Sequence, residues 1–125
     1  MISSIVNKYN GSAIVADTAN IELKDVNIWN GTSLHSTSPV DCTKWVGFSV
    51  IESRFYNNKS KERGAISVLT IPENAVYQKF LVESSQFINN TAENAGAIYV
   101  SNHIMEIINC TFESNRATSG NGGSL

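Results

Sequence analysis

The sequence predicts an all-β protein, and more specifically a right-handed parallel β-helix (a solenoid) of about four to five rungs. Three observations predict this fold: a recurring eight-residue pattern, a Phe-x-x-Asn signature after most copies, and a Gly-Ala-Ile triplet further on. The copies start 27, 32 and 25 residues apart, a period typical of stacked repeats. A rung of this length has room for three short strands and three turns, and the rung itself connects the parallel strands.

The eight-residue pattern has large apolar residues at its first, third and eighth places. Its fifth place is Asp, Glu, Ser or Asn, and its sixth place is small. Alternation with period two and many β-branched and aromatic residues predict strands, and no segment shows the period of a helix. The four copies are residues 21–28, 48–55, 80–87 and 105–112.

Stacking of the rungs would place equivalent residues in vertical files about 4.8 Å apart, and these files would form the core. The three predicted files are Ile21, Phe48, Phe80, Met105; Leu23, Val50, Val82, Ile107; and Ile28, Phe55, Phe87, Phe112. A sandwich of unrelated hairpins would not produce such files. A leucine-rich repeat would need its LxxLxL strand and a convex helical segment, and the sequence has neither.

The asparagine of the signature predicts a corner of each rung. Asn58, Asn90 and Asn115 follow the last phenylalanine of three copies by three residues, and the first copy has Gly31 there. Asparagine tolerates left-handed backbone and its amide bonds to neighbouring main chain, so we expect an inward ladder of asparagines.

The triplets Gly64-Ala65-Ile66 and Gly96-Ala97-Ile98 predict the next strand of each rung, with weaker forms at Ser12-Ala13-Ile14 and Gly122-Gly123-Ser124-Leu125. Glycine would serve a corner where φ is positive. Residues 33–45 and 69–78 predict long insertions between strands.

These motifs resemble the repeats of chlamydial polymorphic membrane proteins, and more broadly the pectin-lyase-like β-helices. The resemblance runs from about Ser12 to Leu125 and is strongest from Phe80 onward, while the first copy lacks the asparagine. It implies a segment of a passenger domain or surface adhesin, located outside the cell or at its surface.

Composition narrows the range of partners. The chain has 125 residues, a net charge of −2 and scattered basic residues, so it offers no electrostatic case for nucleic acid. No apolar run approaches the eighteen residues of a membrane helix, and Met1 starts no secretory signal. We expect residues 1–125 to be one β-helical segment, open at both ends and part of a longer solenoid or completed by a partner chain.

Two cysteines and two histidines predict neither a disulfide nor a metal site. Cys110 occupies the small sixth place of its copy, where an unpaired buried thiol is expected, and Cys42 lies in the first predicted insertion. His35 and His103 are not in a zinc-binding spacing. We expect no cofactor.

A polysaccharide lyase or hydrolase of pectin-lyase-like fold is the alternative from another functional class. Such an enzyme needs clustered carboxylates, and the best cluster is Asp25 with Glu52, at the fifth place of neighbouring copies. Ser84 and Asn109 interrupt this file, so we expect solvated charges at a corner and no catalysis.

A lateral face offers a binding site. Trp29 and Tyr56 directly follow the last apolar residue of two copies, so they would lie one above the other and face outward. Like Trp45 and Tyr77, they would either cover the long insertions or, with Asp25 and Glu52, form a face that binds a glycan or a protein. Of the five Asn-x-Ser/Thr sites, we keep Asn30 and Asn89 as candidate glycosylation sites, because Asn58 and Asn109 occupy repeat positions. We therefore expect a non-catalytic structural or adhesive segment of a surface protein. A subunit of a large filament is a further alternative.

Overall fold

The described part of the chain is all β. The computed structural model describes residues 5–7, 14–17, 20–33, 40–43, 47–69, 79–100, 104–120 and 123. Within these residues every regular element is a strand, and every pairing between the named strands is parallel. This arrangement is consistent with the predicted β-helix.

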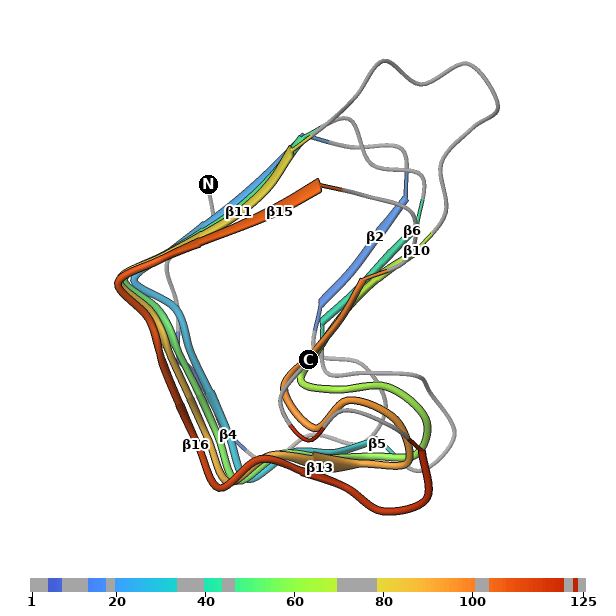
Figure 1. Ribbon diagram of the computed structural model, residues 1–125. Helices are drawn as coiled ribbons and strands as arrows, with labels where there is room; N and C mark the ends of the chain where they lie inside the picture. Colours follow the sequence, from blue (N-terminus) through green and yellow to red (C-terminus); the bar gives the residue numbers. More distant parts are fainter. Residues whose placement is uncertain are drawn as a thin grey trace.

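The chain passes through four sheets in turn, so from β2 onward strands that pair lie four elements apart in the sequence, and β1 pairs with β4 (Figure 1). The first sheet contains β2 (Ile14–Asp17), β6 (Val40–Thr43), β10 (Ile66–Leu69) and β14 (Ile98–Val100). The second contains β3 (Asn20–Lys24), β7 (Gly47–Ile51), β11 (Lys79–Glu83) and β15 (Ile104–Ile108).

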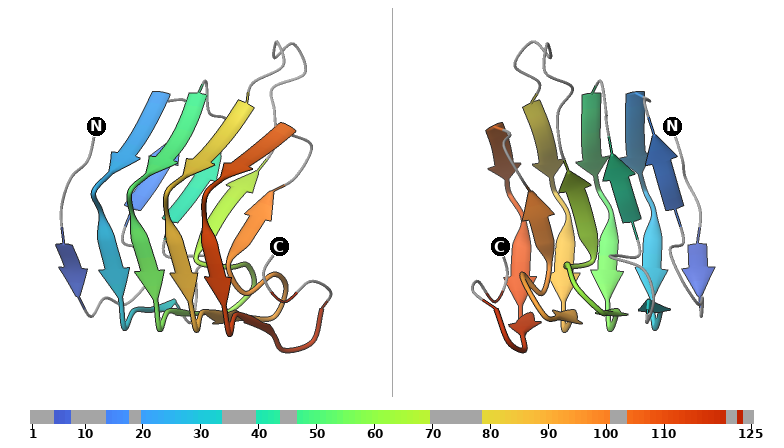
Figure 2. Two further views of the ribbon diagram at one scale, coloured as in Figure 1. Left: turned by 60° about the vertical axis from the view of Figure 1, so that its left-hand side comes forward. Right: turned by 90° about the vertical axis from the view of Figure 1, so that its right-hand side faces the viewer.

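The other two sheets follow in the same order. The third sheet contains β1 (Ile5–Asn7), β4 (Asn27–Trp29), β8 (Arg54–Tyr56), β12 (Gln86–Ile88) and β16 (Thr111–Glu113). The fourth contains β5 (Thr32–Ser33), β9 (Lys59–Ser60), β13 (Thr91–Ala92) and β17 (Arg116–Ala117). We call one passage through the four sheets, such as β10 to β13, a circuit. Each circuit therefore has four strands, one more than the sequence predicted, and the strand in the fourth sheet has only two residues (Figure 2).

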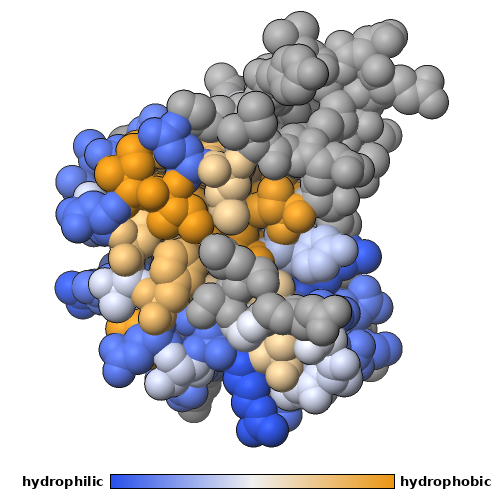
Figure 3. Space-filling model, viewed as in Figure 1, coloured by the Kyte–Doolittle hydropathy of each residue, from blue (hydrophilic) through white to orange (hydrophobic). Residues whose placement is uncertain are grey.

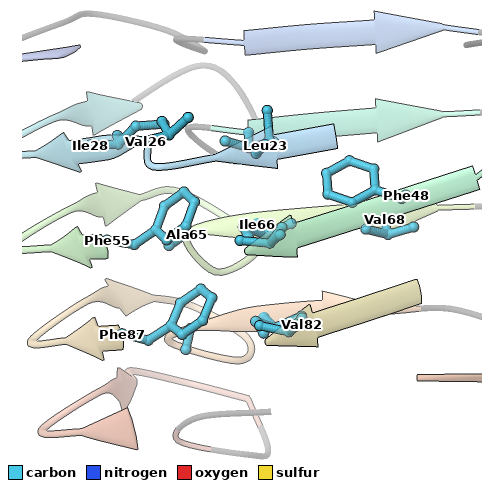
Figure 4. Packing of buried hydrophobic residues seen from close by; sticks show 14 of the residues in the cluster. Leu23, Val26, Ile28, Phe48, Phe55, Ala65, Ile66, Val68, Val82 and Phe87 are labelled. Atoms are coloured by element: carbon cyan, nitrogen blue, oxygen red, sulfur yellow. The ribbon is translucent and has the colours of Figure 1, made fainter. Parts of the chain in front are cut away.

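The predicted core files are confirmed by the register of the sheets. Phe48 pairs with both Ile21 and Phe80, and Phe80 pairs with Met105, as the eight-residue pattern requires. The rings of Phe55 and Phe87 are parallel with centroids 5.0 Å apart, and Phe112 continues the stack at the same spacing. Ile28, Phe55 and Phe87 lie one over another (Figure 4), and all three side chains are fully buried. Hydrophobic burial along these files is the main stabilising contribution to the fold.

The corner between the second and third sheets has an outer and an inner residue. The outer residue is the fifth place of the pattern and has left-handed backbone, with φ of 55° at Asp25 and 50° at Glu52. The inner residue is the small sixth place. There the backbone N–H of Ser53 donates to Ser85 Oγ at 3.1 Å, and that hydroxyl donates to the carbonyl of Glu83 at 2.9 Å. The serine thus accepts a bond from the neighbouring circuit's backbone at the corner.

The predicted asparagine ladder forms the inner side of the next corner. Asn90 Oδ1 accepts from both the backbone N–H and Nδ2 of Asn58, at 3.2 and 3.0 Å. Asn90 Nδ2 donates to Asn115 Oδ1 at 3.0 Å. The left-handed backbone, however, lies one residue earlier than predicted, at Asn57 and Asn89. An inward side chain and a left-handed backbone are therefore supplied by two adjacent residues.

The glycine of the triplet serves close packing and not positive φ, which corrects the prediction. Neither Gly64 nor Gly96 has left-handed backbone. A Cβ at Gly64 would lie 2.5 Å from the carbonyl oxygen of Ala97, and one at Gly96 would collide with backbone of Arg116 and Gly123. Only glycine lets the backbones of neighbouring circuits approach this closely.

The predicted insertion at residues 33–45 is wrong in part, because it contains strand β6. Residues Val40 and Asp41 pair with Ile14 and Val15 on one side and with Ile66 and Ser67 on the other. Cys42 is thus a strand residue of the first sheet and not a loop residue. Residues 70–78 of the second predicted insertion lie outside the described residues.

The last circuit has a less buried core than the circuits before it. Its apolar residues Met105, Ile107 and Phe112 are half-buried and pack against the core, whereas their neighbours Phe80, Val82 and Phe87 are fully buried. Apolar side chains accordingly reach the surface on the face that Figure 3 shows.

Candidate binding face

The outer side of the third sheet carries the predicted aromatic pair. Trp29 and Tyr56 occupy paired positions of β4 and β8, one residue after the buried Ile28 and Phe55, so both side chains point outward. Their rings are parallel to within 4° with centroids 5.7 Å apart. The predicted stacking is confirmed, and the next strand extends this column with Ile88.

Polar side chains border the aromatic pair. Two residues before Trp29 and Tyr56 on the same strands are Asn27 and Arg54, and Gln86 continues that row. Planar polar groups beside an aromatic pair provide both apolar contact and hydrogen bonds. However, each ring covers part of the other ring's face, so this column presents ring edges rather than a flat platform.

The two candidate carboxylates lie at the corner between the second and third sheets. Asp25 and Glu52 are both exposed and both have left-handed backbone. The same corner position holds Ser84 and Asn109 in the next circuits. Short polar side chains such as Asp and Asn are favoured by left-handed backbone because they bond locally, so the turn gives a structural reason for polar residues in this file. Among the described residues, no group of three or more His, Cys, Asp or Glu side chains is placed to bind a metal.

The candidate glycosylation sites lie at exposed corners. Asn30 and Asn89 are both exposed with φ of 53° and 55°, and Asn89 Nδ2 donates to Asn57 Oδ1 at 2.8 Å. Asn58 is only 2% exposed, which agrees with the structural role expected of it. Asn109 is different: it is an exposed outer corner residue, so its accessibility matches that of Asn89. Glycosylation of Asn30 and Asn89 stays a prediction.

Cys110 is a free thiol, as predicted, although it is half-buried and not fully buried. Its Sγ lies 3.2 Å from the carbonyl oxygen of Ile108, the same local contact that the inner serines make. His35 and His103 lie outside the described residues, as do the aromatic residues Trp45 and Tyr77.

Sequence reasoning missed a depression over the fourth sheet. It has a volume of about 250 Å³ and is lined by residues of β9 and β13 and their continuations, among them Lys59, Lys61 and Glu93. Corresponding residues of the two strands, such as Lys61 and Glu93, are 32 positions apart in the chain. They lie side by side because Lys59 pairs with Thr91. The 32-residue spacing that aligns Asn58 with Asn90 also aligns Lys59 with Thr91, so the repeat spacing could have indicated which residues lie side by side here.

Comparison with known proteins agrees with the resemblance seen in the sequence. A search of curated proteins and one of solved structures give no match to this chain. No helix among the described residues is long and apolar enough to cross a membrane. Residues 84–101 match the model of the Chlamydia polymorphic membrane protein repeat, so this part of the chain, which begins at the outer corner residue Ser84 and includes β12 to β14, carries a repeat of that type.

Proposed function

We propose that this chain is a non-catalytic segment of a right-handed parallel β-helix in a surface protein, where it acts as a rigid scaffold with adhesive contacts on its lateral face. The observation that carries the proposal is the register of the sheets: apolar files, the serine contacts and the asparagine ladder all repeat from circuit to circuit. Stacked repeats of this kind form extended surfaces whose outer side chains vary without disturbing the core.

The repeat match supports a surface location, because the matching family is a family of Chlamydia membrane proteins. The half-buried Met105, Ile107 and Phe112 support a further β-helical coil as the partner of the last circuit. Such a coil would continue the apolar files and offer an acceptor to the backbone of Asn115, as Asn115 Oδ1 does for Asn90.

The aromatic pair supports adhesion through the third sheet. Trp29 and Tyr56 are rigid, half-exposed and flanked by Arg54, a combination enriched where proteins bind one another. The outward side chains of a stiff sheet lose little conformational freedom on binding, which favours affinity.

Adhesion and catalysis are separated by two measurements on the purified chain. Beads coated with the chain are expected to bind cell surfaces, and the double variant Trp29→Ala/Tyr56→Ala is expected to reduce bead binding several-fold. The control Leu81→Ala, a half-exposed outward residue of the second sheet, should have little effect. The second measurement follows release of sugar fragments from acidic polysaccharides. If wild type releases sugar fragments, and Glu52→Gln abolishes this turnover while Glu22→Gln preserves it, the chain is an enzyme and the non-catalytic proposal is wrong.

A further inference from the structure

The depression over the fourth sheet contains three charged side chains with no ion pair among the described residues. Lys59, Lys61 and Glu93 are exposed and line the same depression, and none of them lies within 4.0 Å of an opposite charge in the described part of the chain. Solvated charges are ordinary on a flat surface. Charges that converge on one concave site from two circuits provide the elements of a ligand site.

Backbone pairing between two circuits brings these charged residues together. Ser60 is buried between the exposed Lys59 and Lys61, and both lysines line the depression. The N–H of Glu93 donates to the carbonyl of Lys61 at 3.2 Å, so Glu93 follows Lys61 on the neighbouring circuit and lines the same depression. The site therefore has two ammonium groups and one carboxylate.

Uncharged groups complete the lining. Thr91 pairs with Lys59 and contributes a hydroxyl and a methyl group, and Thr118 does the same from the last circuit. The hydroxyl of Thr118 donates to the carbonyl of Ala92 at 3.2 Å, which leaves its oxygen free to accept from a ligand.

We propose that this depression binds one acidic sugar unit of a glycan, a uronate or a sulfated sugar. Its anionic group would be held by Lys59 and Lys61, and its hydroxyl groups would donate to Glu93. The volume of about 250 Å³ lies just below the range for drug-sized ligands, and therefore suits a single sugar and not a longer chain. A simple phosphate or an acidic side chain would also gain from the lysines, but it lacks the several hydroxyl groups that a sugar would donate to Glu93 and that offset the repulsion between the carboxylate and an anion. This proposal deepens the adhesive role proposed above and rests on it.

The test measures binding of a heparin-derived hexasaccharide to the full chain by calorimetric titration. Wild type is expected to bind, and the double variant Lys59→Gln/Lys61→Gln is expected to bind at least about tenfold more weakly, because charge-assisted hydrogen bonds are lost. Lys24→Gln is the matched control, since Lys24 is an equally exposed lysine on the second sheet. It should change the affinity less than about twofold.

Glu93→Gln distinguishes a sugar site from general attraction of anions. A sugar site predicts weaker binding, because a charged acceptor of the sugar hydroxyl groups is replaced by a weaker neutral one. General attraction predicts stronger binding, because a repulsive charge is removed, and that result would overturn the proposal. Equal binding of polyglutamate, equal loss in the Lys24 variant, or no binding by wild type would overturn it as well. Neutral maltohexaose should not bind.

The same titration separates this proposal from the proposed function. If the hexasaccharide binds and is also cleaved, the non-catalytic scaffold is wrong but the sugar site stands. If the hexasaccharide does not bind while the chain still adheres through Trp29 and Tyr56, the sugar site is wrong and the scaffold stands.

Discussion

Asn90 is tolerated in the core because every polar atom of its side chain has a partner. Its Nδ2 donates to the carbonyl of Phe55 at 2.9 Å and to Asn115 Oδ1, and its Oδ1 accepts two bonds from Asn58. Asn90 is fully buried. A buried amide without partners would cost several kcal/mol, so the ladder converts a potential penalty into a specific link between three circuits.

Replacing Asn90 with alanine should therefore destabilise the chain strongly. The change leaves the carbonyl of Phe55 and the N–H of Asn58 buried without these partners, and each unsatisfied group costs about 1–3 kcal/mol. We expect a loss of at least about 3 kcal/mol in the free energy of unfolding, measured by urea denaturation. Asn57→Ala is the control: Asn57 is exposed, and alanine there loses the left-handed preference, about 1 kcal/mol, and one exposed hydrogen bond from Asn89 that water can replace. Equal losses for the two variants would contradict the role of the ladder.

The phenylalanine stack allows a second comparison of identical residues. Phe87 lies between Phe55 and Phe112 with no exposed surface, so Phe87→Ala leaves a cavity and should cost about 3–5 kcal/mol. Phe112→Ala removes the same atoms from a half-buried position and should cost distinctly less. Urea denaturation of both variants measures the difference. A larger loss for Phe112→Ala would mean that the last circuit contributes more to stability than its burial indicates.

At the scale of the strand and its turns, each corner combines an inward residue that forms hydrogen bonds with an outward residue that has left-handed backbone. The first corner uses Glu52 with Ser53, and the second uses Asn57 with Asn58. The outer residue carries conformational strain unless it is Gly, Asn or Asp. Glutamate at φ of 50° therefore fits its turn poorly.

Replacing Glu52 with glycine should relieve this strain. Left-handed backbone costs a residue with a Cβ about 1–2 kcal/mol, and the added freedom of glycine in the unfolded chain offsets about 0.4–1 kcal/mol of the gain. We expect Glu52→Gly to raise the free energy of unfolding by about 0.5–1 kcal/mol, seen as a higher midpoint in thermal melting. Glu22→Gly, on strand β3 of the same face, should lower it by a similar amount. Destabilisation by both variants would show that Glu52 makes a contact that outweighs the strain.

The sequence predicted well those features in which the same residue type recurs at the same position of each repeat. The apolar files follow from the eight-residue pattern, and the asparagine ladder follows from one residue type at one offset. Strand β6 was missed because its first residue, Val40, is preceded by Ser38-Pro39, whereas Ile66 and Ile98 are preceded by Gly-Ala. The apolar residue that begins the strand is nevertheless buried in both cases, Val40 as well as Ile66. The role of Gly64 was misassigned because a need for positive φ and a need for a missing Cβ both select glycine, and only three-dimensional distances separate them.

The candidate sites were predictable only where neighbouring circuits repeat a residue class. Trp29 and Tyr56 are both aromatic at the same offset, so their stacking could be inferred from the sequence. The depression combines lysines of one circuit with a glutamate of the next, and no repeated residue type connects them. Its existence depends on the pairing of Lys59 with Thr91, which follows from the spacing of Asn58 and Asn90, but that spacing does not show that the outward side chains enclose a depression.

At the scale of the whole molecule, each circuit contacts only the circuits next to it, so stability is approximately a sum over neighbours. An inner circuit such as β10 to β13 is covered on both sides, by β6 to β9 and by β14 to β17. Among the described residues, the strands of the last circuit pair with a neighbour on one side only, and Val100, Met105, Ile107 and Phe112 are half-buried. Opening this circuit exposes less additional apolar surface than opening an inner one.

Hydrogen exchange of the backbone amides should reveal this gradient along the stack. We expect the amides of β11 and β12 to exchange about tenfold or more slowly than those of β15 and β16, because the last circuit can open without disturbing its neighbours. Phe112→Ala should speed exchange in β16 further and leave β8, two circuits away, nearly unchanged. Uniform exchange in all sheets would instead mean that the chain opens as one cooperative unit. In that case the interactions between circuits, above all the asparagine ladder, would outweigh the differences in burial among the circuits. The stack would then open only as a whole.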